Sequence, residues 1–308
     1  MPVPQESKNH HNQAPLTWQP YPLGQRIYVA LQYLLPHHLI SALVYHATRW
    51  RWRPWKDFLI QTISNHFKID LGEALDADSE AFGNFNEFFT RRLKPDARPI
   101  ADDTASVACP ADGTISQIGS IKKGRIFQAK GQSFTTLELL GGDQQLAGMF
   151  EEGLFVTIYL SPRDYHRVHM PAAGRLLRDL YVPGRLFSVA PLTVRKIPRL
   201  FARNERIACL FQTTFGPLAQ VLVGAINVSA METLWQGEVP SSRGIRQRDY
   251  AGDANPIVLE RGDEMGRFNM GSTVIVLFPR DALHWCHGIG AGKTVKMGQE
   301  IGRLTQAD

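Results

Sequence analysis

The chain has 308 residues, of which 44% are apolar and 20% are charged, with a formal net charge of +5. This length predicts roughly two domains, and the apolar content excludes a mainly disordered protein. The basic charge favours an anionic partner surface, either nucleic acid or acidic lipid, without choosing between them.

The first segment, residues 1–25, is polar and carries no basic stretch followed by an apolar one. It therefore does not predict a secretory signal peptide. We expect a flexible polar leader.

Two apolar runs with helical spacing follow, from Ile27 to Leu35 and from Leu39 to Ala47. The uncharged stretch is long enough to raise the question of a membrane span, but Pro36-His37-His38 breaks its middle, and polar groups there are costly in hydrocarbon. The next residues, "RWRWRPWK", alternate Arg with Trp, as suits lipid phosphates and the headgroup level. We predict two short helices in a membrane interface; a hairpin packed on the protein's own core and a true span are the alternatives.

Residues 70–100 form a mixed connector, in which a cluster of phenylalanines is expected to pack and two prolines end helical structure: Phe82, Phe85, Phe88, Phe89, Pro95 and Pro99. From about residue 101 the runs "GRIFQAKG", "LFVTIYLSP", "QVLVGAINVSAMETLW" and "STVIVLFP" indicate strands. The predicted class is α+β: a helical, membrane-associating region over 26–100, then a β-rich, barrel- or sandwich-like catalytic domain over 101–308.

Three polar segments of the β-rich domain carry potential chemistry. Asp112 lies in "PADG", His166 and His169 lie in "YHRVH", and Ser272 follows Gly271 at the start of a strand. Taken singly, each has an ordinary reading as a turn or a solvated loop, and the two histidines also suit metal binding or acid–base work. Together they supply the carboxylate, imidazole and hydroxyl needed to activate a serine nucleophile.

Other common signatures are missing. The sequence has no G-x-S-x-G, H-E-x-x-H, P-loop or G-x-G-x-x-G motif. The segment "HWCH", from His284 to His287, has no second ligand cluster to complete a metal site. Three scattered cysteines, Cys109, Cys209 and Cys286, argue against a disulfide framework and suit a reducing compartment.

Seven segments, in this order, resemble the phosphatidylserine decarboxylase family: "FNEFFTRRLKPDARPI", "PADGTISQIG", "YLSPRDYHRVHMP", "YVPGRLFSV", "LFARNERIACLF", "VLVGAINVSAMETLW" and "GDEMGRFNMGSTVIVLF". The resemblance covers about residues 27–278. It implies a carboxy-lyase of phospholipid biosynthesis, which converts phosphatidylserine to phosphatidylethanolamine and CO₂ at a membrane surface.

The same resemblance implies roles for particular residues. Asp112, His169 and Ser272 would form a self-processing triad that cleaves the chain between Gly271 and Ser272, with Gly271 permitting a strained backbone. The products would be a β subunit, residues 1–271, and an α subunit, residues 272–308, and His166 would act in decarboxylation. Met270 replaces the leucine usual at that position, with little expected effect because volume and apolarity are kept.

The implied cofactor is a covalent pyruvoyl group made from Ser272, which would form a Schiff base with the substrate amine; no metal and no pyridoxal phosphate are expected. The implied partners are phosphatidylserine in a membrane and the two fragments as a heterodimer, with a dimer of heterodimers left open and no nucleic acid. The implied location is peripheral, on the cytoplasmic side of the cell membrane. Four basic residues read equally as lipid-phosphate contacts or as a solvated face: Arg195, Lys196, Arg199 and Arg203.

Two rival functions remain at this point. A pyruvoyl decarboxylase acting on a soluble amino acid would not need residues 26–60 as a membrane device. A non-enzymatic module that binds membranes or nucleic acid would account for the basic, Trp-rich segment and would keep its chain intact.

Overall fold

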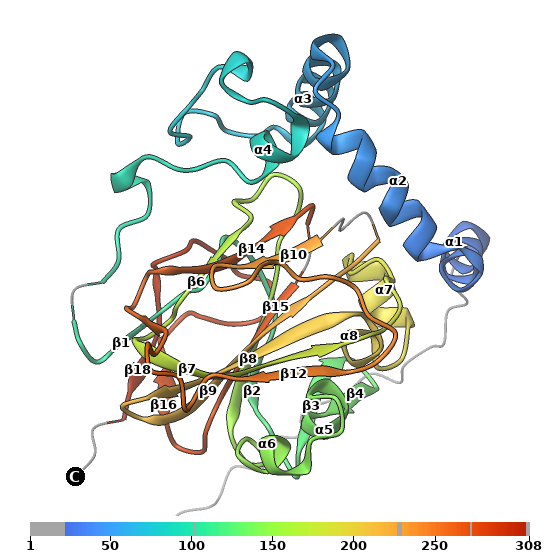
Figure 1. Cartoon of the computed structure of the whole chain (residues 1–308). Coiled ribbons are helices and arrows are strands. Elements are labelled where there is room, and N and C mark those ends of the chain that lie inside the picture. Colours follow the sequence, from blue (N-terminus) through green and yellow to red (C-terminus); the bar gives the residue numbers. More distant parts are fainter. Residues whose placement is uncertain (1–21, 102, 227–229, 272, 306–308) are drawn as a thin grey trace, which may run out of the picture.

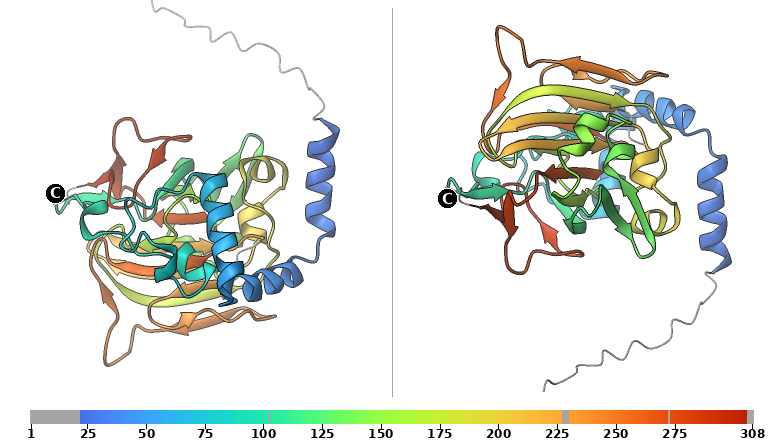
Figure 2. Two further views of the ribbon diagram at one scale, coloured as in Figure 1. Left: turned by 90° about the horizontal axis from the view of Figure 1, so that it is seen from above. Right: turned by 90° about the horizontal axis from the view of Figure 1, so that it is seen from below.

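The computed structural model describes residues 22–101, 103–226, 230–271 and 273–305. Its first three helices are α1 (Leu23–Leu34), α2 (His37–Arg49) and α3 (Arg53–Phe67), and they run along one side of a β-rich body (Figures 1 and 2). The predicted pair of short helices is confirmed, because α1 and α2 meet at an angle of 87°. Most of the predicted polar leader lies outside the described residues.

Helices α1 and α2 place their polar residues against the body and their apolar residues outward. The buried residues are Gln32 in α1 and His37, Ser41 and Thr48 in α2. The exposed side chains are large and apolar: Leu23, Ile27, Leu31, Leu34, Leu39 and Leu43. A hairpin packed on its own core would show the opposite pattern. No described helix is by itself long and apolar enough to cross a membrane, although the bent pair meets that test together by length and composition.

The turn between α1 and α2 binds one loop of the body through polar contacts. The Gln32 Oε1 atom accepts a hydrogen bond from the Ser188 backbone N–H at 2.9 Å, and the His37 Nδ1 atom accepts one from Leu186 at 3.3 Å. The Arg185 guanidinium donates to the Tyr33 carbonyl at 2.7 Å. Loop 184–188 is therefore held in place by the helical region.

The connector contains η1 (Ser79–Ala81), α4 (Phe85–Phe89) and η2 (Pro95–Ala97). The Asn84 side chain caps α4 by accepting a hydrogen bond from the Glu87 backbone N–H at 3.0 Å. The predicted packing of the phenylalanines is confirmed. They form a buried aromatic cluster with one residue of α3: Ile60, Phe82, Phe85, Phe88 and Phe89.

The β-rich body holds the remaining elements. Its strands are β1 (Ser106–Ala108), β2 (Gly113–Ser120), β3 (Arg125–Ala129), β4 (Gln132–Thr135), β5 (Leu154–Tyr159), β6 (Arg167–His169), β7 (Gly174–Val182), β8 (Arg206–Thr213), β9 (Gly216–Val223), β10 (Ala230–Thr233), β11 (Gly237–Glu238), β12 (Arg246–Asp249), β13 (Val258–Leu259), β14 (Glu264–Asn269), β15 (Thr273–Phe278), β16 (Leu283–Trp285), β17 (Thr294–Val295) and β18 (Glu300–Leu304). Its helices are α5 (Thr136–Leu139), α6 (Gln144–Gly148), α7 (Pro191–Lys196) and α8 (Leu200–Arg203).

The largest sheet has nine strands, in the order β12-β7-β8-β9-β15-β5-β2-β17, with β13 also pairing with β7. Its end strands β12 and β17 do not pair with each other in the described part of the chain, so the sheet is open. The barrel-like alternative is therefore corrected. A second sheet, β11-β10-β14-β6, packs against one face of the first and makes the body sandwich-like there.

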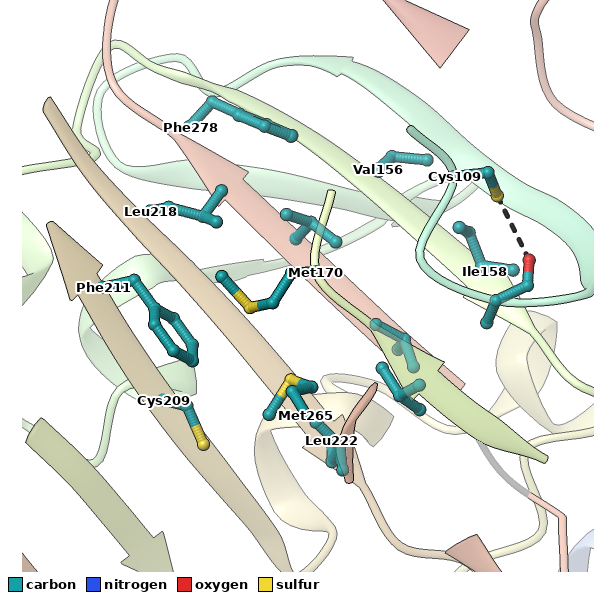
Figure 3. Close-up of a cluster of buried hydrophobic side chains, with 14 of the residues drawn as sticks. Cys109, Val156, Ile158, Met170, Cys209, Phe211, Leu218, Leu222, Met265 and Phe278 are labelled. Atoms are coloured by element: carbon teal, nitrogen blue, oxygen red, sulfur yellow. Dashed lines mark hydrogen bonds between the residues drawn. The ribbon is translucent and has the colours of Figure 1, made fainter. Parts of the chain in front are cut away.

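Side chains of β15 alternate between the two faces of the large sheet. Val274, Val276 and Phe278 enter the core between the two sheets, part of which Figure 3 shows. Ile275 and Leu277 enter the opposite core, under α5 to α8. A strand buried on both faces needs a continuous apolar run, which "TVIVLF" supplies.

The segment after Gly271 is interwoven with the rest of the body. Strand β15 pairs with β5 on one side and with β9 on the other. Further along, β16 and β18 form a small sheet with β1, and β17 pairs with β2. These strand pairs are held by hydrogen bonds between distant parts of the chain. A cut before β15 would therefore not by itself separate them.

Candidate active site

Asp112 lies in the turn before β2, where it joins two distant parts of the chain. Its carboxylate accepts hydrogen bonds from Arg98 at 2.8 and 2.6 Å, from the Lys296 Nζ atom at 3.1 Å and from the Met297 backbone N–H at 2.9 Å. Burial alone would raise the pKa of Asp112, but the Arg98 and Met297 hydrogen bonds hold it below its usual value. The ionised Asp112 carboxylate therefore links Arg98 of the connector to Met297 of the C-terminal segment.

His169 ends strand β6 instead of lying on a loop, as its sequence context had suggested. Its Nδ1 atom is 2.8 Å from the Gly262 carbonyl, and its Nε2 atom is 3.1 Å from the Tyr165 hydroxyl. A carbonyl only accepts, so Nδ1 carries the proton and Nε2 has the free lone pair, which accepts from Tyr165. Burial lowers the pKa of His169, which keeps the ring neutral and suited to act as a base.

In the implied triad Asp112 would orient His169, but no hydrogen bond from the His169 ring to the Asp112 carboxylate is found among the described residues. The Gly262 carbonyl holds the imidazole instead. Burial raises the pKa of Tyr165 to about 12, so its hydroxyl stays protonated and acts as the donor to His169.

His166 is fully buried directly before β6. The Phe89 ring stacks on it with centroids 4.0 Å apart and an interplanar angle of 20°. Neither ring nitrogen has a hydrogen bond of good geometry to a described residue, although the Ser161 and Pro162 carbonyls approach the ring. Burial, with a smaller effect from Arg91, lowers the pKa of His166 to about 3, so the ring is neutral and its nitrogens are available to a ligand.

Gly271 lies against His166. A Cβ atom placed on Gly271 would be 3.4 Å from the His166 Cε1 atom and 3.4 Å from the Leu160 carbonyl oxygen. The residue before it, Met270, has φ of 91°, which is rare for a residue with a side chain and costs of order 1–3 kcal/mol. The backbone strain expected at Gly271 is therefore found one residue earlier. Ser272 lies outside the described residues.

A cavity of about 340 Å³ adjoins this segment, and we call it the reaction chamber. Its walls are mostly apolar: Ile63, Phe67, Phe89, Tyr159, Leu160, Pro162, Ser188, Val189, Ala190, Ala225, Ile226, Met270 and Gly271. Both the aromatic cluster and loop 184–188 contribute to these walls. The chamber is thus built from the helical region and the β-rich body together.

Comparison with known proteins gives a consistent result. A family model described as phosphatidylserine decarboxylase matches residues 85–303, and a second model, described as PSD, matches residues 27–68. The chain belongs to the phosphatidylserine decarboxylase family. The family is one of decarboxylase enzymes, so the expectation of a lyase is confirmed, and the non-enzymatic alternative does not fit.

Three relatives named phosphatidylserine decarboxylase proenzyme show how much of the chain is shared with this family. The protein of Alkalilimnicola ehrlichii is 59% identical over 251 residues, which are 80% of this chain and 86% of that protein. The protein of Methylococcus capsulatus is 53% identical over 280 residues, 90% of this chain and 96% of that protein. The protein of Pseudomonas putida is 51% identical over 287 residues, 92% of this chain and all of that protein.

Several contacts at the candidate site of this phosphatidylserine decarboxylase family member were not predicted from sequence. Phe89 was expected to pack with other phenylalanines but not against His166, and Tyr165 was not singled out, although it lies in the quoted motif "YHRVH". Arg98 and Lys296 carry no local signal, because only folding brings them to Asp112. No group of three His, Cys, Asp or Glu side chains suited to a metal ion occurs among the described residues.

Proposed function

We propose that this chain decarboxylates phosphatidylserine to phosphatidylethanolamine, after cleaving itself between Gly271 and Ser272. The observation that carries the proposal is the position of Gly271, next to the buried, neutral His166 and at the wall of an apolar chamber. The names of the relatives, which are proenzymes, support it further.

The proposed self-cleavage uses the chain's own groups. The Nε2 atom of His169 takes the Ser272 hydroxyl proton, directly or through the Tyr165 hydroxyl, and the Ser272 oxygen attacks the Gly271 carbonyl carbon. The C–N bond breaks and an ester forms. Loss of the Cα proton of residue 272 then breaks the ester C–O bond, leaving a carboxylate on Gly271 and dehydroalanine at residue 272. Hydrolysis of its imine tautomer releases ammonia and leaves a ketone.

Backbone strain at Met270 supports the proposed self-cleavage. Its φ of 91° raises the energy of the uncut segment next to the scissile bond, and the cut would release that segment. Asp112 would contribute by holding the C-terminal segment in place through Lys296 and Met297, because it makes no described contact with His169.

A pyruvoyl ketone at residue 272 would supply the electron sink for loss of CO₂. The residues fit such a group, because the adjacent Gly271 lies against His166, whose two nitrogens are free of good hydrogen bonds. His166 is neutral before substrate binds, and the negative charges of a bound phosphatidylserine headgroup would raise its pKa so that it can hold a proton and deliver it to Cα after CO₂ leaves. The apolar chamber disfavours the charged carboxylate more than neutral CO₂, which supports the same direction of reaction.

A membrane surface is the proposed setting for the reaction. Leu34 is 78% exposed and Leu43 is 63% exposed, and Trp50 and Trp52 are exposed beside Arg51. Apolar side chains facing outward with Trp and Arg beside them suit the boundary between acyl chains and headgroups. We therefore propose peripheral binding to a membrane, and the family resemblance leads us to propose its cytoplasmic side. The strand pairs of β15 would hold the two fragments together.

Denaturing mass analysis of the purified full chain tests the proposal. We expect two fragments that meet at Gly271–Ser272, the shorter one lighter by one ammonia than its sequence, and CO₂ release from phosphatidylserine vesicles. Ser272→Ala should give one unbroken, inactive chain. An intact wild-type chain would refute the self-cleavage, and CO₂ from free serine at the same rate would favour the soluble-substrate alternative.

A further inference from the structure

A second cavity adjoins the reaction chamber, and the charged residues that line it are basic. Its volume is about 810 Å³, and four basic residues line it: His66, Lys68, Arg163 and Arg195. No Asp or Glu is among its described lining residues. We infer that this basic cavity binds the phosphodiester of the phospholipid substrate, an inference that rests on the proposed function.

The two cavities are neighbours, because Phe67, Tyr159 and Val189 line both. In phosphatidylserine only a methylene group and an ester oxygen separate the serine Cα atom from the phosphorus. A substrate whose amine lies beside Gly271 in the reaction chamber therefore has its phosphate close to the shared wall. The basic cavity is the adjoining space that offers cations.

The charges of the basic cavity are only partly neutralised by the protein. Lys68 and Arg195 form no salt bridge with a described residue, and Arg163 has one long contact, 3.9 Å, with the Asp164 carboxylate. Nearby cations outside this cavity differ: Arg199 is paired with Glu138 at 2.7 Å. Cations of one sign around a cleft raise the local concentration of an anion, and arginine donors match phosphate oxygens in pairs.

The remaining walls suit the rest of a phospholipid. Ile115, Val189, Pro191 and Val194 provide apolar surface beside the cations. Glycerol and the first acyl carbons would lie against such surface while the phosphate contacts Arg163 and Arg195. The same site disfavours a free amino acid, which has no phosphate to offer, and so gives the enzyme its preference for phospholipid.

Kinetics with dihexanoyl phosphatidylserine below its micelle concentration separates this site from membrane binding. For Arg163→Ala and Arg195→Ala, we expect KM to rise about tenfold each, since a hydrogen bond to a charged group is worth roughly that much. Fragment formation should stay complete and kcat within about twofold. Arg199→Ala is the matched control, because Arg199 is paired and does not line the cavity, and it should leave KM unchanged. An unchanged KM in the Arg163→Ala/Arg195→Ala double variant would overturn the inference.

Calorimetric titration with glycerol phosphate keeps this test independent of turnover. We expect binding to the wild-type chain and to Arg199→Ala, and about a hundredfold weaker binding to the double variant. Binding that is the same in all three proteins would overturn the basic cavity as the phosphate site. A wild-type protein that binds glycerol phosphate but releases no CO₂ would instead refute the proposed function and leave the site supported.

Discussion

The ring of Phe89 lies flat on the ring of His166, with centroids 4.0 Å apart. Phe89 ends α4, a helix of the N-terminal region, whereas His166 belongs to the β-rich body. The helical region therefore covers the group proposed to move the proton, a role separate from its proposed contact with a membrane.

Removing the Phe89 ring should slow decarboxylation more than self-cleavage. In Phe89→Ala we expect water to reach His166, the pKa of His166 to rise toward its usual value, and decarboxylation to slow about tenfold or more. Cleavage at Gly271 should still occur, because His169 is untouched. The pH profile of kcat/KM measures the shift. Phe82→Ala, in the same aromatic cluster, controls for lost packing, and an equal effect of both variants would contradict the special position of Phe89.

The buried His166 should also make the fold sensitive to acid. Its folded-state pKa of about 3 lies below the unfolded value near 6.5, so the unfolded chain binds the extra proton as the pH falls below 6.5. Stability should therefore decrease with falling pH between 6.5 and 3. In an uncleavable Ser272→Ala background, urea unfolding at pH 7 and pH 5 should show the His166→Phe chain losing about 2 kcal/mol less than the chain with His166 over that interval. An equal loss in both proteins would show that His166 is not the group responsible.

The strained Met270 offers a test through glycine. Met270→Gly should relieve the cost of φ at 91°, because glycine adopts this conformation freely. We expect slower self-cleavage, by up to about tenfold, if the strain assists the reaction. The measurement is the time course of fragment formation after refolding. Met270→Leu is the control, since it keeps the strain, and it should cleave at the wild-type rate.

Asp112 should matter for stability as well as for processing. In an uncleavable Ser272→Ala chain, Asp112→Asn leaves the buried Arg98 guanidinium with Glu73 as its remaining ionic partner and should cost about 3 kcal/mol in unfolding free energy. Denaturant unfolding measures this loss. If the added substitution leaves stability unchanged, Asp112 is not the link that its contacts indicate, and a direct catalytic role becomes the better account.

The exposed leucines of α1 and α2 test the membrane proposal. Leu34→Glu with Leu43→Glu should reduce binding to anionic vesicles by at least tenfold, because both side chains are exposed and charge is disfavoured among acyl chains. Activity on dihexanoyl phosphatidylserine below its micelle concentration should be unchanged. Sedimentation with vesicles measures the binding. Loss of vesicle binding together with loss of activity on the short-chain substrate would point to a structural defect. Unchanged sedimentation would exclude this face as the membrane contact.

Local sequence was enough to predict elements whose pattern is itself local. The two helices broken at Pro36, the packed phenylalanines and the fully apolar β15 all follow from the spacing of apolar residues and prolines. The open edges of the large sheet could not be predicted in this way, because whether a sheet closes into a barrel depends on which strands pair across the whole chain. The choice between barrel and sandwich was beyond the periodicity of any single strand.

The candidate site also has a part that local sequence predicts and a part that it does not. Asp112, His166 and His169 stand in short motifs and were visible as chemistry-bearing residues. Their partners were not, because Arg98, Lys296 and Gly262 reach them only through tertiary contacts. The outward-facing leucines show a related limit: helical spacing identifies an apolar face but does not tell whether that face turns toward the body.

The position of β15 has a consequence for the lifetime of the processed protein. The short C-terminal fragment would begin next to a strand hydrogen-bonded on both sides, at the centre of the large sheet. Once thermal unfolding releases it, reassembly would require a separate, diffusing peptide to find an inner slot between two strands that are free to pair with each other. Heat inactivation of the processed form should then be permanent, whereas the uncut precursor retains a covalent path back to the native state.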